Sequence, residues 1–398
     1  MRVLVISFDA VSDTDLLRMA GTSPCVAGFL QKGTLVSGVE TVFVSNTYPV
    51  HTTVATGLPP KDHKIISNLR NGRWVCDSRR IQAKTLWDAA AEKGLRVAAV
   101  LWPVTGYAKI RYNVPELHIL PGQNQILENL RAGSRWFQLR EFMRHRKKLR
   151  GITQPYLDDF TTSVAVDVLR RKKPDLTLVH LTAYDAFCHM YGKDFGRLQP
   201  AVVSLDRNLG RLLEAAGENV ITVIFSDHGQ LQVGHTADPN TLAGENETGA
   251  FELCGGSAFF RIKKGNPPSR SLLSEMPFCR ELLHKVCQEK WFGRFLTEEE
   301  MTISGYSSVA LFGIAAKPGW CFYEEKARSA ADCGAEPERH GIEKGNHGYP
   351  TDYEDYHVFY GVRGGDFPAD ARKTGGRITD VTKLVANVLG LQGFGAGN

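Results

Sequence analysis

The sequence lacks the features expected of an exported, membrane-spanning or polymer-binding protein. No apolar run approaches the length that crosses a bilayer, and the run at residues 3–8 is too short for a signal peptide and is followed by Asp9. The net charge of +5 is small for 398 residues, which is weak support for a nucleic-acid or membrane partner. We find no internal repeat and no long low-complexity segment.

The eight cysteines are dispersed along the chain, and no C-x-x-C pair occurs among them. In a chain without an export signal, cysteines with this distribution are expected to be reduced thiols. Cys188 lies between two candidate metal ligands, but we interpret it as a buried packing thiol. We therefore expect a cytoplasmic protein.

The composition is ordinary for a soluble globular protein, with 42% hydrophobic and 23% charged residues. Apolar, β-branched runs alternate with helical patterns, which predicts a mainly parallel sheet flanked by helices. We expect one catalytic domain over 1–398 with insertions at 105–155 and 264–340. The predicted strands are 2–8, 35–44, 96–101, 176–181, 219–226, 257–262 and 308–313. The predicted helices are 12–20, 49–56, 84–94, 124–145, 155–172, 197–216, 271–289 and 379–390.

Seven residues with metal-binding or nucleophilic side chains each follow an apolar run or lie at a glycine turn. In an open α/β sheet, ligands bind outside the carboxyl ends of the strands. Three separate strands would therefore deliver carboxylates and imidazoles to one edge, as a site for two cations and an anionic substrate requires. The seven are Asp9, Thr47, Asp185, His189, Asp227, His228 and His347.

Thr47 stands at the start of a predicted helix, because Pro49 suits the first turn and Gly57 suits the end. The free N–H groups and the dipole at a helix start favour a phosphate there. Taken alone, Thr47 would be read as an ordinary helix cap, since threonine is a common cap residue.

The acidic and imidazole residues form three short motifs. Asp185 and His189 are four residues apart, so both lie on one face of a helical turn, as half of a zinc site would. Asp227 and His228 are adjacent at a strand end, and His347 lies in a glycine-rich turn. Each motif alone also fits an ordinary ion pair or a structural histidine.

Together these motifs resemble the alkaline phosphatase superfamily, and most closely its nucleotide pyrophosphatase/phosphodiesterase branch. The resemblance covers about residues 1–70 and 175–235, the loop at His347 and the C-terminal helix. The nucleophile motif of the family matches the segment from Thr47 through Tyr48 and the following proline to a Thr-Gly turn. Lys64 replaces the glycine of a usual His-Gly pair, and Asn68 stands where the family has a phosphate-contacting Asn.

The resemblance implies a three-layer α/β/α sandwich whose insertions form a small cap, and a site for two zinc ions. One ion would be held by Asp185, His189 and His347, and the other by Asp9, Asp227, His228 and the Thr47 oxygen. Asp/His ligation suits zinc, although manganese or iron could occupy similar sites. Metal coordination would lower the pKa of the Thr47 hydroxyl so that it attacks phosphorus and forms a phosphothreonine. Asn68 and the Thr47 N–H would bind a non-bridging oxygen.

Three further residues are candidates for binding the substrate. Tyr48 would stack on a leaving group, or would only pack at the helix start. Lys109 and Arg111 would bind a second anionic group, or would only be surface charges. His235 would lie near the metal ligands or in solvent, and His51 and Asp62 are expected to be structural.

The resemblance implies a hydrolase of phosphodiester or pyrophosphate bonds in small molecules. One alternative is a phosphonate hydrolase of the phosphonoacetate type, with Lys109 and Arg111 on the substrate carboxylate. A phosphomonoesterase is a second alternative, but the chain has no arginine directly after Thr47 to bind the extra phosphate charge. A phosphomutase or a non-catalytic zinc protein is less favoured. We expect neither a nucleic-acid polymer nor a membrane as partner.

Overall fold

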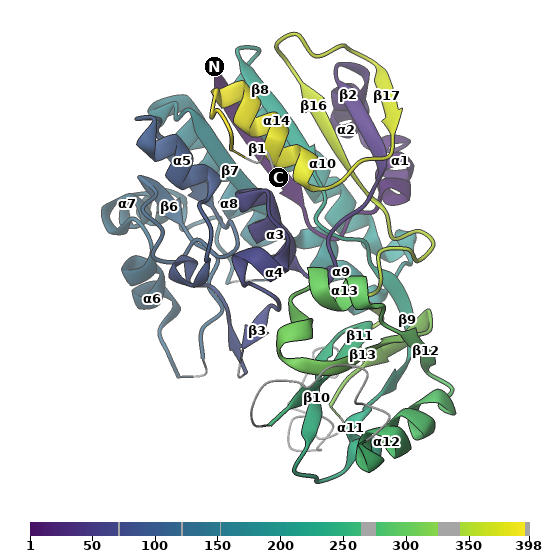
Figure 1. The fold of residues 1–398 in the computed structure, drawn as a ribbon. Helices are drawn as coiled ribbons and strands as arrows, with labels where there is room; N and C mark the ends of the chain where they lie inside the picture. Colours follow the sequence, from purple (N-terminus) through teal and green to yellow (C-terminus); the bar gives the residue numbers. More distant parts are fainter. Residues whose placement is uncertain (71, 121, 152, 264–275, 325–342, 395–398) are drawn as a thin grey trace.

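The computed structural model describes the chain except for residues 71, 121, 152, 264–275, 325–342 and 395–398 (Figure 1). Its centre is an eight-stranded sheet in which neighbouring strands are parallel except at β16, which is antiparallel to both of its neighbours. The predicted mainly parallel sheet is therefore confirmed. In spatial order the strands are β17 (Ala371–Thr374), β2 (Thr34–Val39), β16 (Val358–Arg363), β8 (Val220–Phe225), β1 (Arg2–Phe8), β7 (Leu176–Leu181), β5 (Val97–Val100) and β6 (Tyr112–Val114).

Side chains of β1 alternate between the two faces of this sheet, as the two-residue period of a strand requires. Leu4 and Ile6 belong to one hydrophobic cluster, and Val3 and Val5 belong to another. Helices α1 (Asp13–Ala20), α2 (Pro24–Gln31), α8 (Tyr156–Asp167) and α10 (Phe195–Ala216) pack in the first cluster. Helices α3 (Thr47–Thr56), α5 (Leu86–Glu92) and α14 (Thr379–Leu389) pack in the second, which gives the expected α/β/α layers (Figure 1).

The pairing register of β1, β7 and β8 places the carboxyl ends of these three strands side by side. Phe8 pairs with Leu181, and Ser7 pairs with Phe225. The residues that follow β1, β7 and β8 therefore leave the sheet at the same edge. Helix α9 (Ala183–Tyr191) begins there, directly after β7.

A smaller antiparallel sheet lies beside this edge, drawn in green in Figure 1. Its order is β10 (Gly249–Cys254), β11 (Ser257–Ile262), β13 (Ala310–Ala316) and β12 (Phe292–Phe295). Helices α11 (Asn240–Ala243), α12 (Pro277–Cys287) and α13 (Glu298–Ile303) accompany it. A three-stranded sheet of β14 (Gly319–Phe322), β9 (Leu231–Ala237) and β15 (Gly345–Asn346) carries the chain towards His347.

The predicted single helix at 124–145 is wrong, because the structure has two helices, α6 (Gln125–Ala132) and α7 (Arg135–His145). They are separated at Gly133, whose backbone is extended. A Cβ atom on Gly133 would lie 2.5 Å from Cδ of Pro115 and 2.7 Å from the carbonyl oxygen of Asn113. The close approach of β6 thus requires glycine, and the chain turns there.

Three short elements follow α3: α4 (Pro60–His63), β3 (Leu69–Arg70) and β4 (Arg73–Trp74).

The seven cysteines within the described segments are all free, whereas Cys333 lies outside them. Among the described helices, none combines the length and apolarity needed to cross a membrane. Of the helix predicted at 271–289, residues 271–275 also lie outside the described part of the chain.

Candidate active site

Thr47 is the first residue of α3 and is nearly buried, with 8% of its surface exposed. Its Oγ1 atom lies 3.3 Å from Nε2 of His228. The next backbone N–H, that of Tyr48, donates to Oδ1 of Asn68 over 2.8 Å. The structure therefore brings the predicted nucleophile and the predicted phosphate-contacting amide to the same helix terminus, where the dipole favours an anion.

The residues after β1 and β8 converge on His228. Its Nε2 atom lies 3.4 Å from Oδ1 of Asp9 and 3.3 Å from Oδ2 of Asp227. Together with Thr47 Oγ1, these atoms form the donor set predicted for one metal ion. All three ligand side chains are buried.

The second predicted set is also assembled. Asp185, His189 and His347 each offer one ligand atom, and these atoms lie within 4.8 Å of one another. His189 Nε2 is 3.2 Å from Asp185 Oδ1. The two sets adjoin, because the rings of His228 and His347 are 4.1 Å apart between centroids.

The donors fit positively charged ions. Three buried carboxylate oxygens, Oδ1 of Asp9, Oδ1 of Asp185 and Oδ2 of Asp227, have no hydrogen-bond partner among the described residues. Burying unpaired anionic oxygens is costly unless a cation compensates them. Burial, and then the carboxylates of Asp227 and Asp185, raise the pKa of Asp9 well above its ordinary range. Cations bound to these three oxygens would supply that compensation.

The three histidines of the two predicted metal sites are His189, His228 and His347. In each of them Nδ1 lies near an acceptor oxygen of the protein, so that Nε2 is the nitrogen left to bind a metal. Nδ1 of His228 donates to the carbonyl oxygen of Gly229 over 3.1 Å, and Nδ1 of His347 lies 2.8 Å from Oδ1 of Asn46. Nδ1 of His189 lies 3.0 Å from Oε2 of Glu343. Such contacts fix the tautomer and the ring orientation of metal-binding histidines.

Two of these imidazoles have a lowered pKa, which favours the neutral form that a metal ligand requires. The third, His189, has a raised pKa, because the carboxylates of Asp185 and Glu343 outweigh burial. Burial lowers the pKa of His228 to about 4. Burial, followed by the neighbouring His228 and His189, lowers the pKa of His347 well below its ordinary value.

Several supporting residues were not predicted as part of the site. Asn46 and Glu343 orient histidines, and His180 in β7 places Nε2 3.0 Å from Oδ2 of Asp9. His180 could have been noticed as an imidazole within an apolar strand. Nothing in the sequence alone marks Glu343.

His51 has the structural position that the sequence predicts. It is fully buried, and its Nδ1 donates to the carbonyl oxygen of Thr47 over 2.8 Å. Its Nε2 lies 2.9 Å from Oγ of Ser7. His51 thus ties the first turn of α3 to strand β1.

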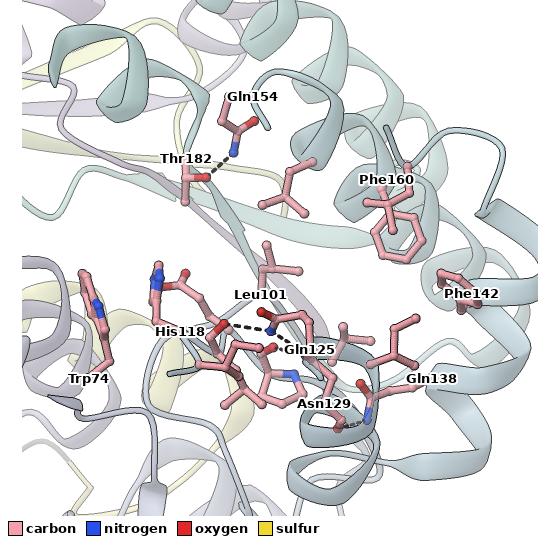
Figure 2. A pocket seen from close by; sticks show the side chains of 18 of the residues that line it. Trp74, Leu101, His118, Gln125, Asn129, Gln138, Phe142, Gln154, Phe160 and Thr182 are labelled. Carbon is pink, nitrogen blue, oxygen red and sulfur yellow. Dashed lines mark hydrogen bonds and ion pairs between the residues drawn. The ribbon is translucent and has the colours of Figure 1, made fainter. Parts of the chain in front are cut away.

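The site opens into a cavity of about 570 Å3 whose lining includes Thr47 and Tyr48 (Figure 2). Three aromatic rings form the wall next to Thr47. Those of Trp74 and His118 stack with centroids 3.9 Å apart, and that of Tyr48 lies 5.3 Å from Trp74. Tyr48 is therefore placed both to pack at the helix start and to border the substrate.

Other predicted substrate contacts are not brought to the site. Lys109 and Arg111 are exposed and do not line this cavity. The ring of His235 lies 4.6 Å from that of Trp320, and Asp62 is exposed.

Comparison with protein families gives one match that spans most of the chain. The model for type I phosphodiesterases and nucleotide pyrophosphatases matches residues 3–350. A human relative, ectonucleotide pyrophosphatase/phosphodiesterase family member 5, is 22% identical over 98% of this chain and 74% of its own. A Xenopus laevis relative, bis(5′-adenosyl)-triphosphatase enpp4, is 20% identical over 98% of this chain and 78% of its own.

Solved structures of similar fold include murine ectonucleotide pyrophosphatase/phosphodiesterase 5. It aligns with a TM-score of 0.70 and 19% identity, covering 98% of this chain and 96% of the murine one. An inactive threonine-to-alanine variant of the murine protein, in complex with AMP, aligns equally well. This similarity confirms the fold.

Proposed function

The chain belongs to the family of type I phosphodiesterases and nucleotide pyrophosphatases, and we propose that it cleaves phosphodiester or pyrophosphate bonds by a metal-dependent reaction through a phosphothreonine at Thr47. It is a hydrolase of this family. Small nucleotides are a substrate class that the relatives suggest, since one is named for a bis(5′-adenosyl) triphosphate and one structure contains AMP.

The proposal is carried by the position of the Thr47 hydroxyl. Its oxygen lies 3.3 Å from His228 Nε2, at a site with three buried carboxylate oxygens that accept no hydrogen bond from the described residues. Asp185, His189 and His347 would hold one zinc ion, and Asp9, Asp227 and His228 would hold the other beside Thr47. When bound, the ions would supply the positive charge that favours a threonine alkoxide and stabilises an anionic phosphate.

The proposed reaction consists of two successive displacements at phosphorus, the first by Thr47 and the second by water. Oγ1 of Thr47 attacks phosphorus, and the bond from phosphorus to the leaving ester oxygen breaks. The phosphothreonine still carries the second ester group of the substrate. Water attacks it, the bond from phosphorus to Thr47 breaks, and a phosphate monoester is released. Asn68 and the N-terminus of α3 would bind the non-bridging oxygen on which charge builds.

Two observations favour the diester over the alternatives. A phosphonoacetate hydrolase was predicted to need Lys109 and Arg111 at the substrate, and neither lines the cavity. The position after Thr47, where an arginine would bind the extra charge of a monoester, holds the buried Tyr48.

The test compares zinc-loaded protein on bis-p-nitrophenyl phosphate, thymidine 5′-p-nitrophenyl phosphate, p-nitrophenyl phosphate and phosphonoacetate. We expect a strong preference for the two diesters and no turnover by Thr47→Ala. Preferred turnover of phosphonoacetate or of the monoester would contradict the proposal. So would a Thr47→Ala variant with undiminished activity.

A cytoplasmic location is a separate proposal. The free thiols of the seven described cysteines are compatible with a reducing compartment. Cell fractionation tests it, with a cytoplasmic signal expected.

A further inference from the structure

Helix α7 packs beside β6, which forms the edge of the central sheet opposite to β17 (Figure 1). Contacts with neighbouring elements define the inner face of α7. The ring of Phe137 lies 5.5 Å from that of Tyr112 in β6, and Nε2 of Gln138 donates to the carbonyl oxygen of Asn129 in α6 over 2.6 Å. Glu141 is also buried. The opposite face of α7 therefore points to solvent.

This outer face of α7 carries a row of apolar side chains. Trp136, Leu139 and Met143 are spaced three and four residues apart, so they lie on one face of the helix. They are 80%, 40% and 52% exposed. The preceding helix α6 adds Ile126 and Leu127, each of which is 51% exposed. Single exposed apolar residues are common, but a group of them indicates an interaction surface.

Positive charge is concentrated in the same part of the chain. Residues 131–150 contain eight arginines or lysines and one acidic residue, which gives a formal charge of +7, whereas the whole chain carries +5. The one acidic residue, Glu141, is buried against two arginine side chains. Arg135, Arg146 and Lys147 are exposed and form no ion pair among the described residues. These three cations are therefore available to an external partner.

The combination of an apolar row and surrounding positive charge indicates the kind of partner. A second copy of this chain would bring two surfaces of like charge together, which is unfavourable. A nucleic acid would meet the positive charge but would offer little apolar contact to Leu139 and Met143. A membrane surface with anionic lipids provides both negative headgroups and an apolar layer beneath them.

We propose that α7 and the basic segment after it dock the protein on the surface of a membrane that contains anionic lipids. Trp136, Leu139 and Met143 would enter the boundary between headgroups and acyl chains, as the apolar face of an interfacial helix does. The basic side chains around them would contact the lipid phosphates. The inference goes beyond the proposed function and does not depend on it. The small net charge of the whole chain, which is weak support for a membrane partner, averages out this local concentration.

The test measures co-sedimentation of the protein with lipid vesicles. Vesicles of phosphatidylcholine alone are compared with vesicles that also contain about 30% phosphatidylglycerol, which makes the surface anionic. We expect binding to the anionic vesicles to be at least about tenfold tighter, because each basic side chain near such a surface raises the affinity about fivefold. Raising the salt concentration from about 0.1 M to about 0.5 M should weaken the binding, since it screens the charges. The absence of binding to anionic vesicles would overturn the inference.

A substitution in the apolar row locates the bound surface. We expect Trp136→Ser to weaken binding to anionic vesicles about tenfold, because it removes the largest apolar contact. Leu17→Ser is the matched control, because Leu17 is 53% exposed on α1, which lies on the other side of the molecule (Figure 1). It should leave the binding unchanged.

A second variant removes charge, and its control removes the same charge elsewhere. The combined variant Arg135→Gln, Arg146→Gln and Lys147→Gln should weaken binding roughly 100-fold. The control has three substitutions of exposed residues near β17, at the opposite edge of the sheet: Lys32→Gln, Lys373→Gln and Arg377→Gln. It should leave the binding nearly unchanged.

Fluorescence quenching tests whether Trp136 itself enters the lipid. Lipids with brominated acyl chains quench a tryptophan that reaches them. The chain has six tryptophans, so the parent is compared with Trp136→Phe, which keeps an apolar ring. We expect quenching in the parent and its loss in the variant, with binding retained. Equal quenching in both proteins would place another tryptophan at the membrane and would overturn the inference.

The other outcomes also decide the question. If only the charge variant weakens binding and Trp136→Ser does not, the basic residues attract anions without insertion of the apolar row. The inference is then overturned in favour of a polyanion such as a nucleic acid. If the control near β17 weakens binding as much as the charge variant, only net charge matters, and the inference is again overturned. Circular dichroism of every variant establishes that a loss of binding is not a loss of folding.

Discussion

Nε2 of His180 lies 3.0 Å from Oδ2 of Asp9, while Nδ1 of the same ring lies 2.8 Å from Oε2 of Glu116. This buried Asp–His–Glu row holds one oxygen of Asp9 and leaves the other, Oδ1, 3.4 Å from His228 Nε2. Although burial opposes the charged imidazolium, the hydrogen bonds to Asp9 and Glu116 raise the pKa of His180 well above its ordinary value. His180 therefore fixes the direction in which Asp9 presents its free oxygen.

We predict that His180→Asn lowers metal affinity and kcat/KM by roughly 10- to 100-fold, as is typical when a residue behind a metal ligand is removed. Titration with zinc and diester kinetics measure the two effects. His180→Gln, which keeps a longer amide donor, should recover part of the loss. Parental zinc affinity in His180→Asn would show that Asp9 needs no such support.

Asn68 is predicted to act on the transition state. Its Oδ1 accepts the Tyr48 N–H, which holds the amide beside the nucleophile. Asn68→Ala should lower kcat by roughly 10²- to 10³-fold, the usual cost of losing one donor to a developing oxyanion. Metal content, measured by mass spectrometry of the metals, should stay the same. An unchanged kcat would exclude this role.

Asn46 is predicted to support the second metal through His347, whose Nδ1 lies 2.8 Å from its Oδ1. Asn46→Ala removes that acceptor and should weaken zinc binding by roughly 10- to 100-fold. Asn46→Asp keeps an acceptor oxygen and serves as the matched control, with affinity near that of the parent. Equal affinities in all three proteins would contradict the prediction.

Metal removal should destabilise the fold, because it leaves one buried oxygen each of Asp9, Asp185 and Asp227 without a hydrogen-bond donor among the described residues. A ligand at 100 times its Kd stabilises the native state by about 2.7 kcal/mol. We expect chelation to lower the Tm by roughly 3 °C or more and zinc to restore it, as calorimetry would show. Asp9→Asn should shrink the difference. A Tm that is insensitive to chelation would argue against bound metal.

The position of the site could be predicted from the sequence because it depends on strand ends. Asp9 and Asp227 each follow a buried strand, and parallel pairing brings such ends to one edge of the sheet. The helix start at Thr47 could also be predicted, since Pro49 follows it closely. The roles of these residues came from a family resemblance rather than from periodicity.

Features that depend on contacts between distant segments could not be predicted. Gly133 separates α6 from α7 because β6 passes close to it. Helix propensity depends only on residues nearby in the sequence, so it cannot predict this contact. Glu343 meets His189 across more than 150 residues of chain, and no sequence pattern links the two. The cavity beside Thr47 is likewise built by segments whose packing is set only in three dimensions, which is why its aromatic wall was not foreseen.

The central claim is that Thr47 is the nucleophile, and trapping its covalent intermediate tests this most directly. Zinc-loaded protein is mixed with bis-p-nitrophenyl phosphate, quenched in acid within the first turnover, and digested for mass spectrometry. We expect a p-nitrophenyl phosphoryl group on Thr47, and none in Thr47→Ala. Rapid product release without an adduct on Thr47, or with the adduct on another residue, would contradict the account.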